Sequence, residues 1–421
     1  MKVRIIILLA FVCQSFISSG QDKVSLLFIG DVMGHGPQIK SAYIDSLGIY
    51  DYHHCFKYIE PSIRSADVTI ANLEVTLGGY PYQGYPHFSS PDTLVDALVD
   101  AGIDVLVTAN NHILDRGKKG LNRTMNVLDA KGVPHTGAFR DSADRKKRNP
   151  LIIETKGFKL ALLNYTYGTN GIEQEAPNIV NYIDTAVISK DISYTQSLGV
   201  DKIIVFVHWG LEYKLQAVSS QVLLKDFLWS QGIDVLIGSH PHVVEPVIWE
   251  KTPEHNRMVA YSLGNFISNQ RTSPRDGGMM VMVTLEKDAE TTAISDVSYQ
   301  LTWVDTPEED GKKKYYVMPA RLYANDTVAL SSSSIYQQNR YIAASGEVFA
   351  NNVNVLESIY YRTIDKPLAP LVFDDTYFDE IFSDGELTVE LENSTTELES
   401  SRYVQISEEL QAKGRKRKKS K

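Results

Sequence analysis

Cysteine is nearly absent from this chain of 421 residues, which contains only Cys13 and Cys55. Cys13 lies in an N-terminal segment that we expect to be removed, so Cys55 would be the one thiol of the mature chain. A single cysteine cannot form an intramolecular disulfide, and it cannot build a thiolate zinc cluster. Any metal site in this protein must therefore use His, Asp, Glu and Asn side chains.

The sequence also lacks a long apolar run of the kind that crosses a membrane. Lys2 and Arg4 precede an apolar stretch from Ile5 to Ile17, and the small residues Ser18-Ser19-Gly20 follow it. This order of charged, apolar and small zones is typical of a secretory signal. The stretch is shorter than the roughly 20 residues of a transmembrane helix. We therefore predict a signal peptide over residues 1–20.

The predicted signal peptide has consequences for location. Cleavage after it would make Gln21 the mature N-terminus and would place the protein in the periplasm or the cell envelope. Lipid anchoring at Cys13 is the alternative, and Val12 disfavours it because valine is a poor residue before a lipidated cysteine.

An excess of positive charge is missing as well. The formal net charge is −10, and loss of Lys2 and Arg4 with the signal peptide would make it two units more negative. This balance argues against a nucleic-acid partner. With 43% hydrophobic and 22% charged residues, the composition is that of an ordinary globular protein that can bury a large core.

The C-terminal part differs in composition from the rest. Residues 367–401 hold ten acids and no Lys or Arg, and residues 413–421 are strongly basic. Blocks of like charge are usually solvated tails. We predict a C-terminal extension over 286–372, packed on or following the core, and a flexible tail over 373–421. The basic end is either a disordered terminus or a contact with an anionic membrane surface or envelope assembly.

A repeated unit of short apolar run, polar loop and helical stretch extends from residue 24 to about 285, and we predict one domain over 22–285. Runs this short and apolar are typical of strands buried on both faces of an α/β fold. The predicted strands are Ser25–Ile29, Asp67–Ala71, Asp104–Thr108, Lys159–Asn164, Lys202–Val207, Asp234–Ile237, Met258–Ser262 and Met279–Leu285.

Two helices are predicted from the spacing of apolar residues, over Lys119–Lys131 and Ser219–Gln231, and a glycine marks the end of each. The residues expected to face the core are Leu121, Met125 and Leu128 in the first helix and Val222, Leu223 and Phe227 in the second.

Polar residues follow five of the predicted strands within a few positions: Asp31, Glu74, the pair Asn111 and His112, His208, and the pair His240 and His242. Taken alone, an Asp after a strand is usually a turn former, and a lone His is usually structural. Ligand sites in such sheets favour the strand C-termini. A set of potential ligands repeated at one edge of a buried sheet has no packing rationale, so the coincidence favours a metal site.

Six sequence blocks resemble the ordered signature of the CapA family, within the calcineurin-like metallophosphoesterase superfamily. They are Gly30-Asp31-Val32-Met33, Asn72-Leu73-Glu74, Ala109-Asn110-Asn111-His112-Ile113-Leu114-Asp115, His208-Trp209-Gly210-Leu211-Glu212-Tyr213, Gly238-Ser239-His240-Pro241-His242 and Tyr261-Ser262-Leu263-Gly264-Asn265-Phe266. The resemblance covers about residues 24–285. It implies a four-layer α/β/β/α sandwich of two sheets that holds two divalent metal ions bridged by a carboxylate.

The resemblance also implies a role for each ligand. Asp31 resembles the carboxylate of the first motif, and Glu74 stands where a bridging Asp is usual. Asn111, His208 and His240 resemble the ligands of the second metal, and His242 would return to the first. Neutral imidazoles, an amide oxygen and carboxylates suit Mn, Zn or Fe without choosing between them.

One residue departs from the superfamily pattern. The first motif normally has a His two residues after its Asp, and this chain has Met33 there. The first metal site is therefore expected to be weaker or differently filled. His35 is a candidate extra ligand, and a structural role in the loop is its alternative.

Further residues are candidates for catalysis or substrate binding. His112 resembles the residue that protonates the leaving group, and Asp115 would orient it if the loop turns helically; a helix cap is the alternative for Asp115. Glu212 is a candidate substrate contact or a surface ion-pair residue.

The segment 79–88 is rich in Gly, Pro and aromatic residues and follows Glu74 closely, so it is expected to form a loop over the site. Tyr82, Tyr85 and His87 in this loop are candidates to stack on a sugar or glycan, or to pack as a lid.

These observations predict an exported, metal-dependent hydrolase that acts on a phosphoester in the cell envelope. The resemblance implies a link to the synthesis or processing of capsule or a poly-γ-glutamate-like polymer. Hydrolysis or transfer at an amide bond of such a polymer is the enzymatic alternative. A non-catalytic envelope protein that retains the metal is the other, and His112 discriminates against it because a mere metal scaffold would not need this residue.

Overall fold

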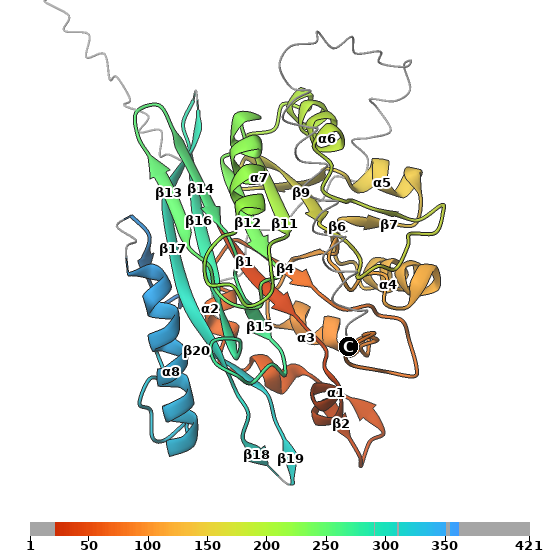
Figure 1. Ribbon diagram of the computed structural model, residues 1–421, viewed down its shortest axis with the longest axis vertical. Coiled ribbons are helices and arrows are strands. Elements are labelled where there is room, and N and C mark those ends of the chain that lie inside the picture. The colour runs from red at the N-terminus through yellow and green to blue at the C-terminus, as the bar shows by residue number, and fades with distance from the viewer. Residues whose placement is uncertain (1–21, 290, 310, 351–353, 362–421) are drawn as a thin grey trace, which may run out of the picture.

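A computed structural model describes residues 22–289, 291–309, 311–350 and 354–361 of the protein (Figure 1). The predicted signal peptide with Cys13 and the predicted tail over 373–421 lie outside these residues. Among the residues described, no helix is both long enough and apolar enough to span a membrane.

The first of two large sheets has the strand order β20-β17-β16-β1-β4-β5-β6. In that order the strands are Tyr316–Pro319, Thr292–Asp305, Gly277–Lys287, Asp22–Val32, Val68–Leu73, Val105–Val107 and His135–Thr136, with β15 (Asn265–Ile267) paired to β1 and β21 (Leu356–Glu357) paired to β17. Strands β1, β4, β5 and β6 run parallel, so their carboxyl ends meet at one edge.

The second sheet has the order β13-β14-β12-β11-β9-β8. These strands are Val247–Lys251, Asn256–Ala260, Val235–Ser239, Lys202–His208, Phe158–Thr166 and Leu151–Thr155. Its four central strands, β14, β12, β11 and β9, are parallel. Short pairs complete the strands: β2 (Tyr43–Ile44) with β3 (Ile49–Tyr50), β7 (Ala138–Phe139) with β10 (Ile179–Val180), and β18 (Glu308–Glu309) with β19 (Lys312–Lys313).

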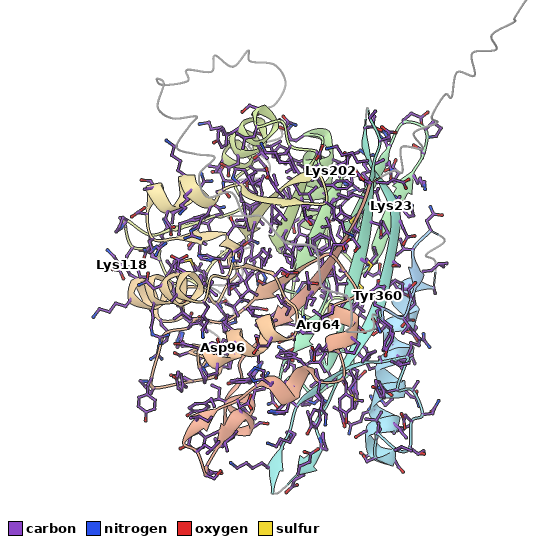
Figure 2. All side chains as sticks on the ribbon, turned by 180° about the vertical axis from the view of Figure 1, so that it is seen from behind. Lys23, Arg64, Asp96, Lys118, Lys202 and Tyr360 are labelled. Atoms are coloured by element: carbon purple, nitrogen blue, oxygen red, sulfur yellow. The ribbon has the colours of Figure 1, made fainter. Side chains whose placement is uncertain are left out.

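The alternation of side chains along β1 explains how the sheets are layered. Leu26 and Phe28 belong to the apolar cluster that also holds Ile204 and Phe206 of the second sheet. Leu27 and Ile29 belong instead to the cluster formed with the helices. Because successive side chains of a strand point to opposite faces, both faces of β1 are buried. Side chains fill the space between the sheets (Figure 2).

Helices cover the outer face of each sheet, which confirms the predicted four-layer α/β/β/α architecture. Helices α3 (Thr93–Asp100) and α4 (Gly117–Ala130) pack on the first sheet. Helices α6 (Thr185–Ser197) and α7 (Ser219–Ser230) pack on the second. The other helices are α1 (Gly36–Ala42), the 3₁₀ helix η1 (His53–Phe56), α2 (Glu60–Ile63), α5 (Ser142–Arg148) and α8 (Ser332–Phe349).

Both predicted helices are present, but the core face predicted for the second is wrong for Val222 and Leu223, and of its three predicted residues only Phe227 packs against the core. In α4 the buried residues include Leu121, Met125 and Leu128, as expected. In α7 the buried residues are Gln221, Leu224 and Leu228, whereas Val222 and Leu223 are 36% and 43% exposed. Gln221 takes a core position instead, and its side chain there donates to a buried carboxylate.

The first sheet continues beyond residue 285, the boundary expected between the domain and its extension. That position lies inside β16. The whole length of β16 is paired with β17. Helix α8 packs on β17 and contributes Tyr341 and Phe349 to the cluster between the sheets. The extension is thus part of the sandwich, as far as residue 361.

Candidate metal centre

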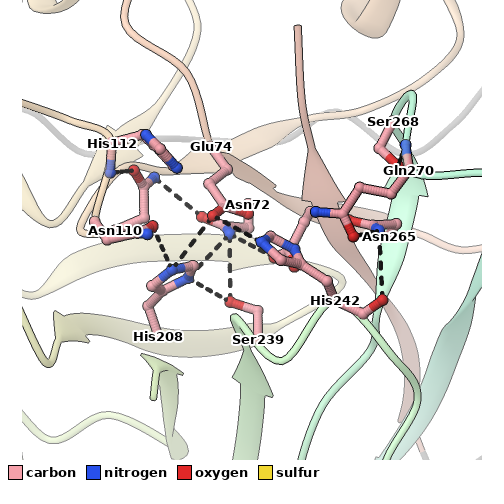
Figure 3. Close-up of polar contacts among 12 residues, drawn as sticks. Asn72, Glu74, Asn110, His112, His208, Ser239, His242, Asn265, Ser268 and Gln270 are labelled. Carbon is pink, nitrogen blue, oxygen red and sulfur yellow. Dashed lines mark hydrogen bonds and ion pairs between the residues drawn. The ribbon is translucent and has the colours of Figure 1, made fainter. Parts of the chain in front are cut away.

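The structure brings the polar residues that follow the strands together at one place between the two sheets (Figure 3). Two groups of potential ligands are present among the described residues, and within each group the ligand atoms lie within 4.8 Å of one another. The groups are Glu74, His208 and His240, and Asp31, Glu74 and His242. Glu74 belongs to both groups, as a bridging carboxylate would.

Asn111 adjoins the first group. Its Oδ1 lies 2.9 Å from Nε2 of His208, the same ring nitrogen that lies 3.6 Å from Oε1 of Glu74. All six ligands expected from the sequence are therefore neighbours. Three come from the first sheet and three from the second.

Burial gives these groups an unusual electrostatic state. Glu74 is completely buried, and neither of its carboxylate oxygens has a hydrogen-bond partner. Burial raises its pKa well above the usual range, and the nearby Asp31 carboxylate raises it further. Burial likewise lowers the pKa of His208 and of His240 well below the usual value, so both rings are neutral.

A divalent cation fits this donor set. Two buried carboxylates without a positive counter-charge are costly, and a cation between them would remove that cost. Neutral imidazoles and ionised carboxylates are the forms that bind metal. Nδ1 of His240 is also buried without a partner.

Asparagines that had no predicted role hold the ligands in position. Nδ2 of Asn72 donates to Oδ1 of Asp31 at 2.8 Å, and the other carboxylate oxygen of Asp31 lies 3.0 Å from Nδ1 of His242. Nδ2 of Asn110 donates to the carbonyl of Leu73 at 2.8 Å, next to Glu74. These bonds orient the ligands in the way that outer partners do in metal sites.

Asn265 is a further oxygen donor that the sequence did not single out. It lies on β15, whose register with β1 pairs it with Asp31. Its Nδ2 donates to the carbonyl of Arg275 at 2.8 Å and to that of His242 at 3.3 Å. Its Oδ1 is buried and has no partner. The available signal was an Asn within one of the quoted blocks, directly after Gly264.

Tyr167, just beyond the end of β9, is the other residue that sequence reasoning missed. It is partly buried, and its ring lies 4.5 Å from that of His240 and 6.1 Å from that of His208. Its side chain also interacts with Asn111. The strand β9 was predicted, but an aromatic residue at a strand end is not distinguishable from ordinary core.

Met33 and His35 show how the departure from the superfamily pattern is accommodated. Met33 is buried among apolar residues. His35 is in neither group of ligands: its ring packs edge-on against Phe88 at 5.2 Å, and its Nδ1 lies 3.1 Å from Oε1 of Gln38 at the start of α1. The structure therefore supports the structural role for His35 and does not bring it in as a ligand.

His112 and Asp115 form a contact of the kind expected for an oriented acid. Nδ1 of His112 lies 2.7 Å from Oδ2 of Asp115, and both residues are buried. The same carboxylate oxygen accepts from the backbone N–H of Phe88 at 2.8 Å. The Phe88 ring packs edge-on against the His112 ring at 4.6 Å. The His112 ring is thus held on two sides, and among the described residues no hydrogen-bond partner is seen for its other nitrogen, Nε2.

The loop over 79–88 reaches the site through Phe88 and not through the predicted residues. Tyr85 is 74% exposed and His87 is also exposed. The Tyr82 ring packs against Tyr50 at 5.1 Å. Glu212 is exposed, yet its charge contributes to the raised pKa of Glu74, so it lies near the site.

The backbone around the second sheet's ligands is strained and closely packed. His240 and His242 have φ angles of 105° and 58°, which non-glycine residues rarely adopt. A Cβ on Gly238 would lie 2.1 Å from a backbone carbonyl oxygen, so glycine is required there. The conformation of the loop that carries both histidines is therefore determined by its close backbone packing as well as by the histidine side chains.

Comparison with known proteins shows the family of this chain. The family model described as "Bacterial capsule synthesis protein PGA_cap" matches residues 25–270, and the chain belongs to this family. The capsule biosynthesis protein CapA of Bacillus anthracis is 26% identical over 348 residues, which cover 80% of this chain and 77% of that protein.

The PGA biosynthesis protein CapA of Bacillus subtilis (strain 168) is 27% identical over 276 residues, covering 63% of this chain and 69% of that protein. A crystal structure of the calcineurin-like phosphoesterase YfkN from Bacillus subtilis aligns with 78% of this chain and 98% of that chain at 13% identity and a TM-score of 0.40, a likeness too slight to bear on function.

Proposed function

We propose that this protein is an exported metal-dependent hydrolase of the phosphoesterase type, which acts on a cell-envelope substrate during the synthesis or processing of capsule or a poly-γ-glutamate-like polymer. The observation that carries the proposal is Glu74. This residue belongs to both groups of ligands, and neither of its carboxylate oxygens has a hydrogen-bond partner among the described residues. The capsule-synthesis relatives support the biological setting.

The residues of the site would divide into metal ligands and a proton donor. Asp31, Glu74 and His242 would hold one divalent ion, and Asn111, His208 and His240, with Glu74 shared, would hold the other. When bound, such a pair lowers the pKa of a water and stabilises the charge on attacking and leaving oxygens.

His112 stands beside this set without being part of it. Asp115 occupies its Nδ1, so Nε2 is the atom that would hold the proton and deliver it to a leaving oxygen. Phe88 excludes water from one side of the ring. A protein that only stored metal would have no use for a buried His fixed by a carboxylate next to a ligand.

Cleavage or transfer at an amide bond of a γ-glutamyl polymer is the second candidate. It is favoured by the names of the relatives, because a polymer of glutamate contains amide bonds and no phosphoester. The same proton donor would serve a leaving amine.

Metal analysis and a substrate screen test the proposal together. The full chain, purified without chelator, should contain up to two equivalents of Mn, Zn or Fe. It should cleave phosphodiesters or phosphomonoesters faster than γ-glutamyl amides. An active preparation that contains no metal would end the proposal, and turnover of γ-glutamyl substrates alone would select the second candidate.

A further inference from the structure

Arg275 lies at the rim of the candidate metal centre. It contributes a positive charge there and is not one of the ligands. Its guanidinium carbon is 4.5 Å from the centre of the Tyr213 ring. The Tyr213 ring in turn lies 6.2 Å from that of His242. Only one aromatic ring therefore separates the guanidinium from a ligand.

Hydrogen bonds to the main chain of Tyr213 and of Arg275 connect both residues to the segments that carry the ligands. The N–H of Tyr213 donates to the carbonyl of Pro241, between the two histidines, at 2.8 Å. The carbonyl of Arg275 accepts from Asn265 at 2.8 Å. The positions of Arg275 and Tyr213 are thus fixed relative to the ligands, which would not be expected for a pair of ordinary surface residues.

The backbone at Tyr213 is also strained. Its φ angle is 65°, in the left-handed region that bulky residues avoid, and the side chain is 44% exposed. Strain of this kind is costly and clusters at ligand-binding positions. The cost is explained if the ring must stand where it supports the guanidinium.

Arg275 makes no ion pair among the residues that the structure describes, although the Glu212 carboxylate interacts with the same Tyr213 side chain. No carboxylate among the described residues lies within ion-pair distance of its guanidinium. The adjacent Asp276 is turned away and accepts from Nε1 of Trp303 at 2.9 Å. Burial and then the Glu212 carboxylate raise the pKa of the Tyr213 hydroxyl, whereas Arg275 lowers it.

We propose that Arg275, supported on the Tyr213 ring, is a subsite for an anionic group of the substrate that lies beyond the reacting bond. This inference rests on the proposed function and narrows its substrate to a molecule that carries a negative charge close to the bond that is cleaved. A guanidinium presents several N–H donors in one plane, which suits both carboxylate and phosphate oxygens. Arg275 is a binding residue for that group and takes no part in the proton transfer.

The test is a binding measurement by calorimetry on the metal-loaded full chain, so it does not depend on turnover. One arm compares a γ-linked triglutamate with the same peptide after amidation of its free carboxylates. The other compares a glycerol phosphate trimer with a triglycerol. Arg275→Gln should weaken the binding of the charged ligand in the correct arm about 10- to 100-fold, the range for one hydrogen bond to a charged group. The binding of the neutral counterpart should not change.

Two further variants separate charge recognition from structural damage. Glu212→Gln should strengthen the charged ligand a few-fold, because it removes a like charge from the rim. Arg257→Gln is the matched control: Arg257 also stacks on an aromatic ring, Trp229 at 4.1 Å, but is paired with Glu250 and is remote from the ligands. It should change nothing, and all variants should keep their metal content.

The outcomes distinguish the subsite from the activity. A loss confined to the carboxylate arm identifies a carboxylate as the bound group, and a loss confined to the phosphate arm identifies a phosphate. If Arg275→Gln weakens charged and neutral ligands equally, or neither, the subsite is wrong whatever the protein catalyses. If the charge-specific loss is seen but no ester or amide is cleaved, the subsite stands and the proposed hydrolase function fails.

Discussion

Glu245 allows a quantitative prediction about stability and pH. It is completely buried, and among the residues that the structure describes its only side-chain partner is Gln221, whose Nε2 donates to Oε2 at 2.6 Å. The other oxygen, Oε1, has no partner. Burial raises the pKa of Glu245 to about 8, from its ordinary value of 4.5. The side chain is therefore protonated in the folded protein at neutral pH and ionised in the unfolded chain.

The sign of the effect follows from proton counting. Between pH 4.5 and 8 the unfolded chain binds fewer protons at this group than the folded protein does, so the stability falls as pH rises. The slope is about 1.4 kcal/mol per pH unit for one such group. From pH 5.5 to pH 7.5 the contribution of Glu245 should thus decrease by about 2.5 kcal/mol, slightly less than the full slope over two pH units because the folded group begins to lose its proton as the pH approaches 8.

Glu245→Gln should abolish this slope, because glutamine fills the same space and does not titrate. The assay is denaturant unfolding at several pH values, with the free energy of unfolding of the variant subtracted from that of the wild type. Glu250→Gln, which removes a partly exposed ion pair with Arg257, is the control and should leave the slope unchanged. Parallel curves for the wild type and Glu245→Gln would show that Glu245 is ionised in the folded state and would refute the reasoning.

The remaining predictions concern the site. Replacing His112 with Gln should leave the metal content intact and reduce turnover about 10²- to 10⁴-fold, less for nitrophenyl esters, whose leaving group departs without a proton; loss of metal in this variant would contradict the role. His240→Ala should lower metal occupancy and abolish turnover for all leaving groups alike, whereas the exposed His255→Ala should match the wild type by metal analysis. Gly238→Ala should prevent stable folding, because its Cβ would lie 2.1 Å from a carbonyl oxygen, while Gly168→Ala, with open space around it, should unfold at the wild-type temperature.

The sequence predicted the layers and the neighbourhood of the ligands because both depend on local patterns. Short apolar runs identified the central parallel strands, and the residue directly after such a strand has its position determined by the strand. Asp31, Glu74 and His208 could therefore be placed at a common edge. Their binding of metal stays a prediction, as does the proton-donor role of His112.

Features that depend on distant contacts could not be predicted. Asn265 becomes a neighbour of Asp31 only through the pairing of β15 with β1. The core position of Gln221 in α7, where it bonds to Glu245, is not revealed by hydrophobic spacing. His35 lies four residues after Asp31 yet is directed by Gln38 and Phe88. The strand β17 alternates apolar and polar residues but gains its place only by pairing with β16.

The two sheets contribute different kinds of ligand atom. The first provides oxygen donors, from Asp31, Glu74 and Asn111, and the second provides imidazole nitrogens, from His208 and the loop after β12. Each group of ligands contains members from both sheets. A slip of one sheet past the other by a single residue, about 3.3 Å, would separate the oxygens from the nitrogens. Tight metal uptake during refolding would therefore record the moment when the two preformed sheets dock in register, and not the formation of either sheet.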